Sequence, residues 1–156
     1  MTKTRLKKHL RYIVPEIRLA LIKEPCSKKP QAINHPGDIE QFVEPLKHYS
    51  EEHFVSLHLD ARQHVTSFHI VSHGTLSASL VHPREVFKAA LLANSHSIIV
   101  AHNHPSGSEE PSGDDIETTE KLIAAGKLLG VNVIDHIIVT SNGIYSLREY
   151  YPNLWM

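Results

Sequence analysis

The sequence predicts an α/β sandwich in which a mixed β-sheet is covered by flanking helices. Short apolar runs of strand length alternate with longer segments whose apolar residues recur at helical spacing. The 156 residues are also enough for one compact domain with a core of its own and a modest extension. We expect a basic N-terminal extension over residues 1–37 and the domain over residues 38–156.

The extension is marked by basic residues and prolines. Terminal charge runs are most often simply solvated, but this one could contact nucleic acid or another acidic partner. Residues 11–21 are apolar enough to form an edge strand or to dock on a neighbour, and Pro15 disfavours a central strand. The basic residues at its start are Lys3, Arg5, Lys7, Lys8 and Arg11.

The first half of the domain is expected to hold one helix and three strands. Apolar residues follow a helical stripe from Asp38, and Pro45 is expected to bend that helix. Alternating apolar residues then predict strands over residues 54–59, 65–71 and 78–81.

The second half is expected to alternate helices and strands. Proline is favoured at the first helical position, and glycine after the last one. The expected elements are a helix from Pro83, a buried strand over 97–101, a helix over 113–129 that ends at Gly130, a strand over 131–139 and a hairpin at 141–143.

Two imidazoles, a hydroxyl and a carboxylate follow the strand that ends at residue 101. His102 and His104 lie two residues apart at the strand end, so their side chains point the same way. Ser112 is a candidate helix N-cap, which places Asp115 in the first helical turn. Imidazole and carboxylate ligands with a fourth position open for water are expected of a catalytic zinc site.

A second interpretation of the same residues is purely structural. Ser112 and Asp115 also have the spacing of a capping box, and the chain has 13 histidines, so a His-x-His pair is unsurprising. The combined order of strand end, Gly/Pro loop and helix start favours a metal site. Cys26 is the single cysteine, which excludes a cysteine zinc finger.

This pattern resembles the JAMM motif of JAB/MPN+ metalloproteases, and its surroundings are similar to the RadC family of JAB-domain proteins. The resemblance covers roughly residues 50–150 and implies a JAB/MPN-like, cytidine-deaminase-like fold with Zn²⁺ held by His102, His104 and Asp115. Asn103 stands where deubiquitinating members carry Ser or Thr, which favours the RadC branch. The similar stretches are His82–Phe87, Ala101–Gly107, Pro111–Asp115 and Asp135–Val139.

The resemblance implies a zinc-dependent hydrolase that cleaves a peptide or isopeptide bond. In the resembling families the general base is a glutamate just before an early core strand. Glu52 occupies that place, and Glu51 and Glu85 are the competing candidates. Zinc would lower the pKa of a water toward about 7, and Ser112 would donate to the oxyanion, a contribution of about 3 kcal/mol. We expect that donation to compete with capping of the helix.

Two other function classes remain open. One is a DNA-associated protein that uses the basic extension, with metal-dependent phosphodiester cleavage as a variant, and the other is an inactive scaffold. A contiguous His-Asn-His tripeptide does not favour an HNH nuclease, whose named residues are dispersed. His136 could orient a metal ligand or be an ordinary strand histidine.

Composition narrows the classes further. A formal net charge of −1 argues against a generally basic nucleic-acid binder. No apolar run approaches the roughly 20 residues of a membrane span, and no signal peptide is evident. We therefore expect a cytoplasmic protein.

Overall fold

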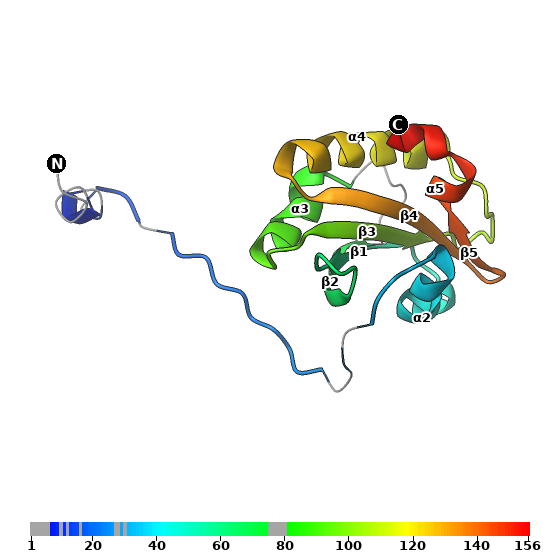
Figure 1. Cartoon of the computed structure of the whole chain (residues 1–156), viewed down its shortest axis with the longest axis horizontal. Coiled ribbons are helices and arrows are strands. Elements are labelled where there is room, and N and C mark those ends of the chain that lie inside the picture. Colours follow the sequence, from blue (N-terminus) through cyan, green and yellow to red (C-terminus); the bar gives the residue numbers. More distant parts are fainter. Residues whose placement is uncertain are drawn as a thin grey trace.

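The fold is a mixed five-stranded sheet with helices on both faces (Figure 1). It is seen in a computed structural model, which describes residues 7–9, 11, 13–15, 17–26, 29, 31–74 and 81–156. The strand order is β2-β1-β3-β4-β5, in which β3 and β4 are parallel and the other neighbours are antiparallel. The strands are β1 (His53–Leu59), β2 (Val65–His73), β3 (Ser97–Asn103), β4 (Asn132–Thr140) and β5 (Gly143–Ser146).

Two apolar clusters lie on opposite faces of the sheet. Along β3, Ile98 and Val100 belong to the cluster that includes α3 (Pro83–Leu92) and α4 (Gly113–Leu129). Ile99 instead belongs to the cluster under η1 (Pro36–Ile39), α2 (Glu40–Val43) and η2 (Glu44–His48). Every β3 residue is buried, as expected of a central strand covered on both faces. α5 (Leu147–Tyr150) and η4 (Pro152–Trp155) complete the chain.

Most of the predicted elements are confirmed with small shifts of their ends. The helix over 113–129 has the predicted bounds, and Gly130 ends it in the left-handed conformation at φ 72°. A Cβ at Gly126 would collide with the carbonyl oxygen of Val131, so glycine there lets α4 lie close to the chain entering β4. The observed fold is thus the mixed sheet with flanking helices that the sequence predicts.

Three expectations have a different outcome. The helix predicted from Asp38 is instead three short consecutive segments, and Pro45 lies in the first turn of the last one, where its missing N–H is tolerated. The residues described within 11–21 form no strand, since Pro15 lacks an N–H and this segment stands apart from the sheet (Figure 1). The predicted strand over 78–81 lies mostly outside the described residues, and Val81 is buried without strand structure.

The end of the extension is tied to the domain. Ala32 forms a β-bridge with His64, and Ile33 is buried in the core cluster under α2. The division at residue 37 stays a prediction. None of the helices in the described part of the chain is long and apolar enough to cross a membrane.

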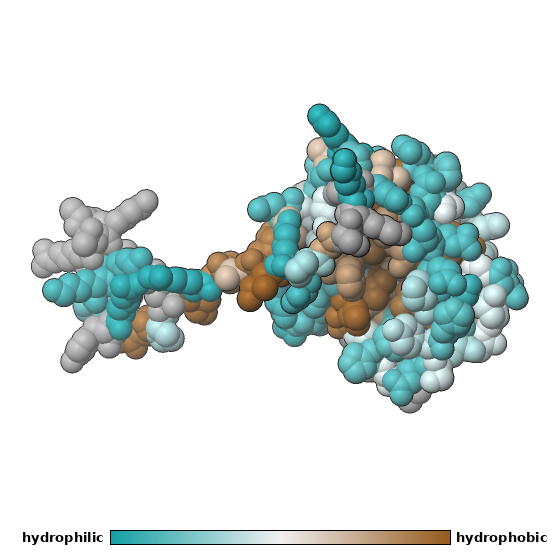
Figure 2. Space-filling model, turned by 90° about the horizontal axis from the view of Figure 1, so that it is seen from below, coloured by the Kyte–Doolittle hydropathy of each residue, from teal (hydrophilic) through white to brown (hydrophobic). Residues whose placement is uncertain are grey.

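Apolar side chains are exposed both on the extension and on the domain (Figure 2). Ile17, Leu19 and Ile22 are exposed on the extension, and Phe68 and Ile70 are exposed on β2. β2 is one of the two edge strands of the sheet, and the exposure of Phe68 and Ile70 shows that its face is not covered there.

His58 is a histidine enclosed by the sheet. Its side chain is only 2% exposed, and its two ring nitrogens lie 3.0 Å from Ser56 Oγ and 2.9 Å from Ser67 Oγ. Burial, and secondly the charge of His69, lower the pKa of His58 from 6.5 to about 4. His58 is therefore neutral in the folded protein at pH values where the unfolded chain already binds a proton.

The His58→Gln variant should lose part of the pH dependence of stability. In the wild type, acidification from pH 6.5 to 4 should lower the free energy of unfolding, because only the unfolded state gains a proton at His58. The pKa shift of His58 corresponds to a fall of about 3 kcal/mol in the free energy of unfolding of the wild type. The variant should not show this part of the fall. Urea unfolding at several pH values measures the difference, and identical pH profiles for the two proteins would contradict the assignment.

Candidate metal centre

The end of β3 brings His102 and His104 to one face of the sheet. His102 is fully buried on β3, where it pairs with Phe54 of β1 and Ile138 of β4. His104 follows the strand, and its backbone N–H donates to Val139 O at 2.9 Å. The Nε2 atoms of the two histidines lie 2.9 Å apart, as their spacing of two residues predicts.

Asp115 reaches the same point from the first turn of α4. Ser112 Oγ accepts from Asp115 N at 3.1 Å, and Asp115 Oδ2 accepts from Ser112 N at 2.7 Å. This is the capping box that the sequence predicts. It fixes the carboxylate at the helix start, where Oδ1 lies 3.1 Å from His102 Nε2 and Oδ2 lies 3.2 Å from His104 Nε2.

These three side chains could hold a metal ion. Ligand atoms about 2.0–2.1 Å from a tetrahedral zinc ion are about 3.3 Å from one another, close to the separations seen here. Two imidazole nitrogens and a carboxylate oxygen also form the donor set of catalytic sites that keep one position open. Both roles expected of Asp115 are therefore compatible, since it caps α4 and faces the two histidines.

The charges of the three residues favour an ionised carboxylate. Burial alone would raise the pKa of Asp115, but hydrogen bonds from His102 and His104 hold it well below its usual range. The hydrogen bond with Asp115 raises the pKa of His104 above 6.5. An ionised carboxylate therefore lies between the two imidazoles, where a metal cation could also bind.

The three glutamates considered as general base lie in different surroundings. Glu52, just before β1, is partly buried, which raises the pKa of its carboxyl group, and that group also senses the charges of His102, Asp115 and His104. Glu51 is exposed, and its Oε2 would be 3.0 Å from a Cβ at Gly74. Glu85 binds Lys88 at 2.7 Å in the first turn of α3. This arrangement favours Glu52, whose catalytic role stays a prediction.

Asn103 connects the segment that carries Glu52 to β3. Its side chain is 1% exposed, and its Oδ1 accepts from His53 N at 2.7 Å. Its Nδ2 donates to Glu51 O at 3.0 Å and to Tyr49 O at 3.3 Å. In the sequence, Asn103 serves only as a marker of the RadC branch, although alternation along β3 indicates that it points away from His102 and His104.

His136 of β4 lies directly behind His102. Its Nε2 is 2.8 Å from His102 Nδ1, and burial lowers the pKa of His136 well below 6.5. His136 therefore contacts the ring nitrogen of His102 that is not directed at His104 and Asp115.

Ser112 is exposed at the edge of the site. Its Oγ uses a lone pair to accept from Asp115 N, so the hydroxyl hydrogen can still be donated elsewhere. The expected competition between capping and oxyanion donation is therefore wrong, because one hydroxyl can accept and donate together.

A pocket of about 220 Å³ opens beside His104. It lies between η2, the loop after Asn103 and the end of β4, and its lining includes Lys47, Tyr49 and Ser141. Of the three candidate ligands, His104 is the one that lines this pocket, which lies on the η2 side of the loop.

Comparison with known proteins identifies the family of the domain. Residues 33–152 match the RadC-like JAB domain family. A UPF0758 protein of Methanosarcina mazei is 43% identical over 129 residues, which cover 82% of this chain and 55% of that protein. A UPF0758 protein of Symbiobacterium thermophilum is 46% identical over 116 residues, which cover 74% of this chain and 50% of that protein.

The chain spans about half the length of these curated relatives. Within that half, the family match includes both histidines, Asp115, Glu52 and the whole five-stranded sheet. The chain belongs to the RadC-like JAB domain family.

Proposed function

We propose that this protein is a zinc-dependent hydrolase that cleaves a peptide or isopeptide bond. The observation that carries the proposal is the convergence of His102, His104 and Asp115 from the end of one strand and the start of one helix. Membership of the JAB domain family supports the same chemistry.

Zinc, when bound, supplies an activated water and polarises the scissile carbonyl group. Glu52 takes a proton from the attacking water and delivers it to the leaving amine. Its raised pKa suits this exchange, because a base whose pKa lies closer to neutrality can both accept and return a proton. Ser112 donates its hydroxyl hydrogen to the oxyanion, while Asp115 N–H remains bonded to the same oxygen.

Glu52→Gln and Asp115→Asn should fail in different ways. Glu52→Gln should keep zinc and the fold but lose hydrolysis by about two to four orders of magnitude, the usual contribution of a positioned base. Asp115→Asn should instead weaken zinc binding, since a neutral amide is a poorer ligand than a carboxylate. Zinc content and cleavage of a fluorescence-quenched peptide and isopeptide panel measure the two effects.

The matched control for Glu52→Gln is Glu51→Gln, because Glu51 is adjacent but exposed away from the ligands. Its activity and zinc content should equal those of the wild type. Full activity in Glu52→Gln would move the base role elsewhere, and loss of zinc in that variant would make Glu52 a ligand.

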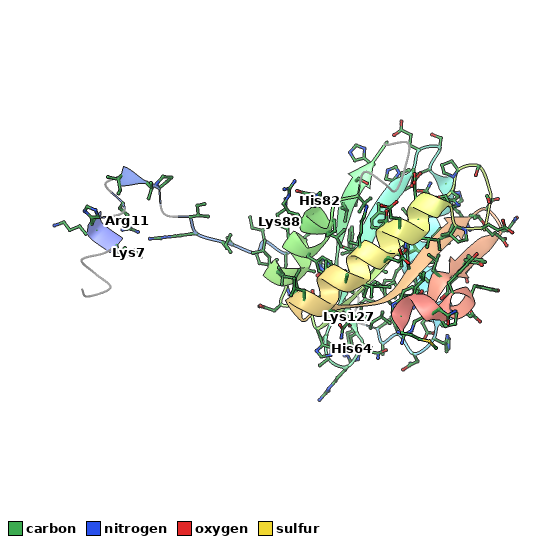
Figure 3. All side chains as sticks on the ribbon, turned by 90° about the horizontal axis from the view of Figure 1, so that it is seen from above. Lys7, Arg11, His64, His82, Lys88 and Lys127 are labelled. Carbon is green, nitrogen blue, oxygen red and sulfur yellow. The ribbon has the colours of Figure 1, made fainter. Side chains whose placement is uncertain are left out.

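We also propose nucleic-acid binding by the extension as a second function, on the basis of charge segregation. Residues 1–37 contain nine of the 16 Lys and Arg residues but two of the 17 Asp and Glu residues, a formal charge of +7 against −8 for residues 38–156. Lys7, Lys8 and Arg11 are exposed, and Figure 3 shows Lys7 and Arg11 apart from the domain. A positively charged extension can bind the phosphate backbone of a nucleic acid, whereas the negatively charged domain would be repelled by it.

Replacing Lys3, Arg5, Lys7, Lys8 and Arg11 together by Gln should weaken binding of a labelled DNA duplex. The slope of log affinity against log salt should become shallower by up to about four. The reason is that a phosphate no longer neutralised by a Lys or Arg side chain does not release its counterions. Fluorescence anisotropy over a salt series measures both quantities. Equal affinity and slope in the two proteins would dismiss this function.

A further inference from the structure

A chain of buried hydrogen bonds leads from His102 back to the helix that carries Asp115. His102 Nδ1 lies 2.8 Å from His136 Nε2, and His136 Nδ1 lies 2.6 Å from Thr119 Oγ1. Thr119 Oγ1 in turn lies 2.6 Å from Asp115 O. His102, His136 and Thr119 are all fully buried, so these groups bond to one another and not to bulk water.

The direction of each hydrogen bond follows from the last one. Asp115 O is a carbonyl oxygen, which can only accept, so the Thr119 hydroxyl donates its one hydrogen to it. The same hydroxyl can then only accept from His136, which places the ring hydrogen of neutral His136 on Nδ1. Nε2 of His136 is therefore an acceptor, and His102 donates to it from Nδ1.

The fold holds the two imidazole rings in this arrangement. β3 and β4 are parallel, and their register pairs Val100 with His136. Val100 precedes His102 by two residues, so His136 and His102 point to the same face of the sheet. Phe54 packs against both rings, with its ring centroid 5.9 Å from that of His102 and 5.5 Å from that of His136.

On the basis of the metal site proposed above, we propose that Thr119 and His136 are positioning residues that set the tautomer of His102. With a hydrogen of His102 held on Nδ1, Nε2 is the ring nitrogen left to bind a metal, and it faces His104 and Asp115. Thr119 also bonds the backbone of Asp115, so one network aligns a ligand on β3 with a ligand on α4. A ligand fixed in its binding tautomer needs no rearrangement when a metal enters.

Thr119→Val and Thr119→Ser separate this role from ordinary packing. Valine has nearly the shape of threonine without the hydroxyl, whereas serine keeps the hydroxyl. Thr119→Val should weaken Zn²⁺ binding about tenfold, the lower end for a partner that orients a metal ligand, and Thr119→Ser should restore wild-type affinity. Competition with a chromophoric chelator measures the affinity, and far-ultraviolet circular dichroism verifies that each variant is folded.

His136→Leu and His136→Gln test the next residue in the network. Leucine cannot accept from His102 and should lower Zn²⁺ affinity about 10-fold to 100-fold. Glutamine can present an amide oxygen near the position of Nε2 and should recover part of that loss. The visible absorption spectrum of the Co²⁺-loaded protein should change in His136→Leu and Thr119→Val, since a reoriented His102 alters the ligand field. The same spectrum should be unchanged in Thr119→Ser.

Nitrogen NMR of the zinc-loaded wild type reads the tautomer directly. The ring hydrogen of His136 is expected on Nδ1, and a hydrogen found on Nε2 would overturn the assigned directions. Wild-type Zn²⁺ affinity in Thr119→Val, or equal losses in Thr119→Val and Thr119→Ser, would also overturn the role of the hydroxyl while leaving the proposed hydrolase intact. A wild type that binds no Zn²⁺ would instead reject the metal site itself and this inference with it.

Discussion

The parallel pairing of β3 with β4 inside the sheet is the interaction on which the rest of the structure depends. It continues beyond the last strand residue, because His104 N still donates to Val139 O at 2.9 Å. It therefore fixes both histidines at the carboxyl end of β3 and places His136 behind His102. The crossover between these two strands is α4, so the connection that makes them parallel also delivers Asp115.

The sequence could predict the parts of the site that depend on local geometry. His102 and His104 alternate with Asn103 along one strand, and Asp115 shares a capping box with Ser112 three residues earlier. Each of these relations is set by backbone period or by the first turn of a helix. For the same reason the helix over 113–129, with glycine after it, has the predicted bounds.

The remaining features depend on contacts between distant segments, which no local period specifies. Asn103 bonds His53, which is 50 residues away, and it is this contact that ties the Glu52 segment to the histidines. The choice between Glu52 and Glu51 depends on which carboxyl group lies near the two histidines and Asp115. A shift of one residue in the register of β1 would exchange them. The bond between His102 and His136 likewise requires the strand order, and the apolar stripe from Asp38 does not reveal that this region divides into three short segments.

The most direct test of the account is the zinc content of the full chain after equilibration with Zn²⁺ and removal of unbound metal. The wild type is predicted to retain about one zinc ion per chain, and His104→Ala should lose it, because two ligands are too few for a stable site. A folded wild type that retains no zinc would contradict the account, and so would a His104→Ala variant with undiminished zinc.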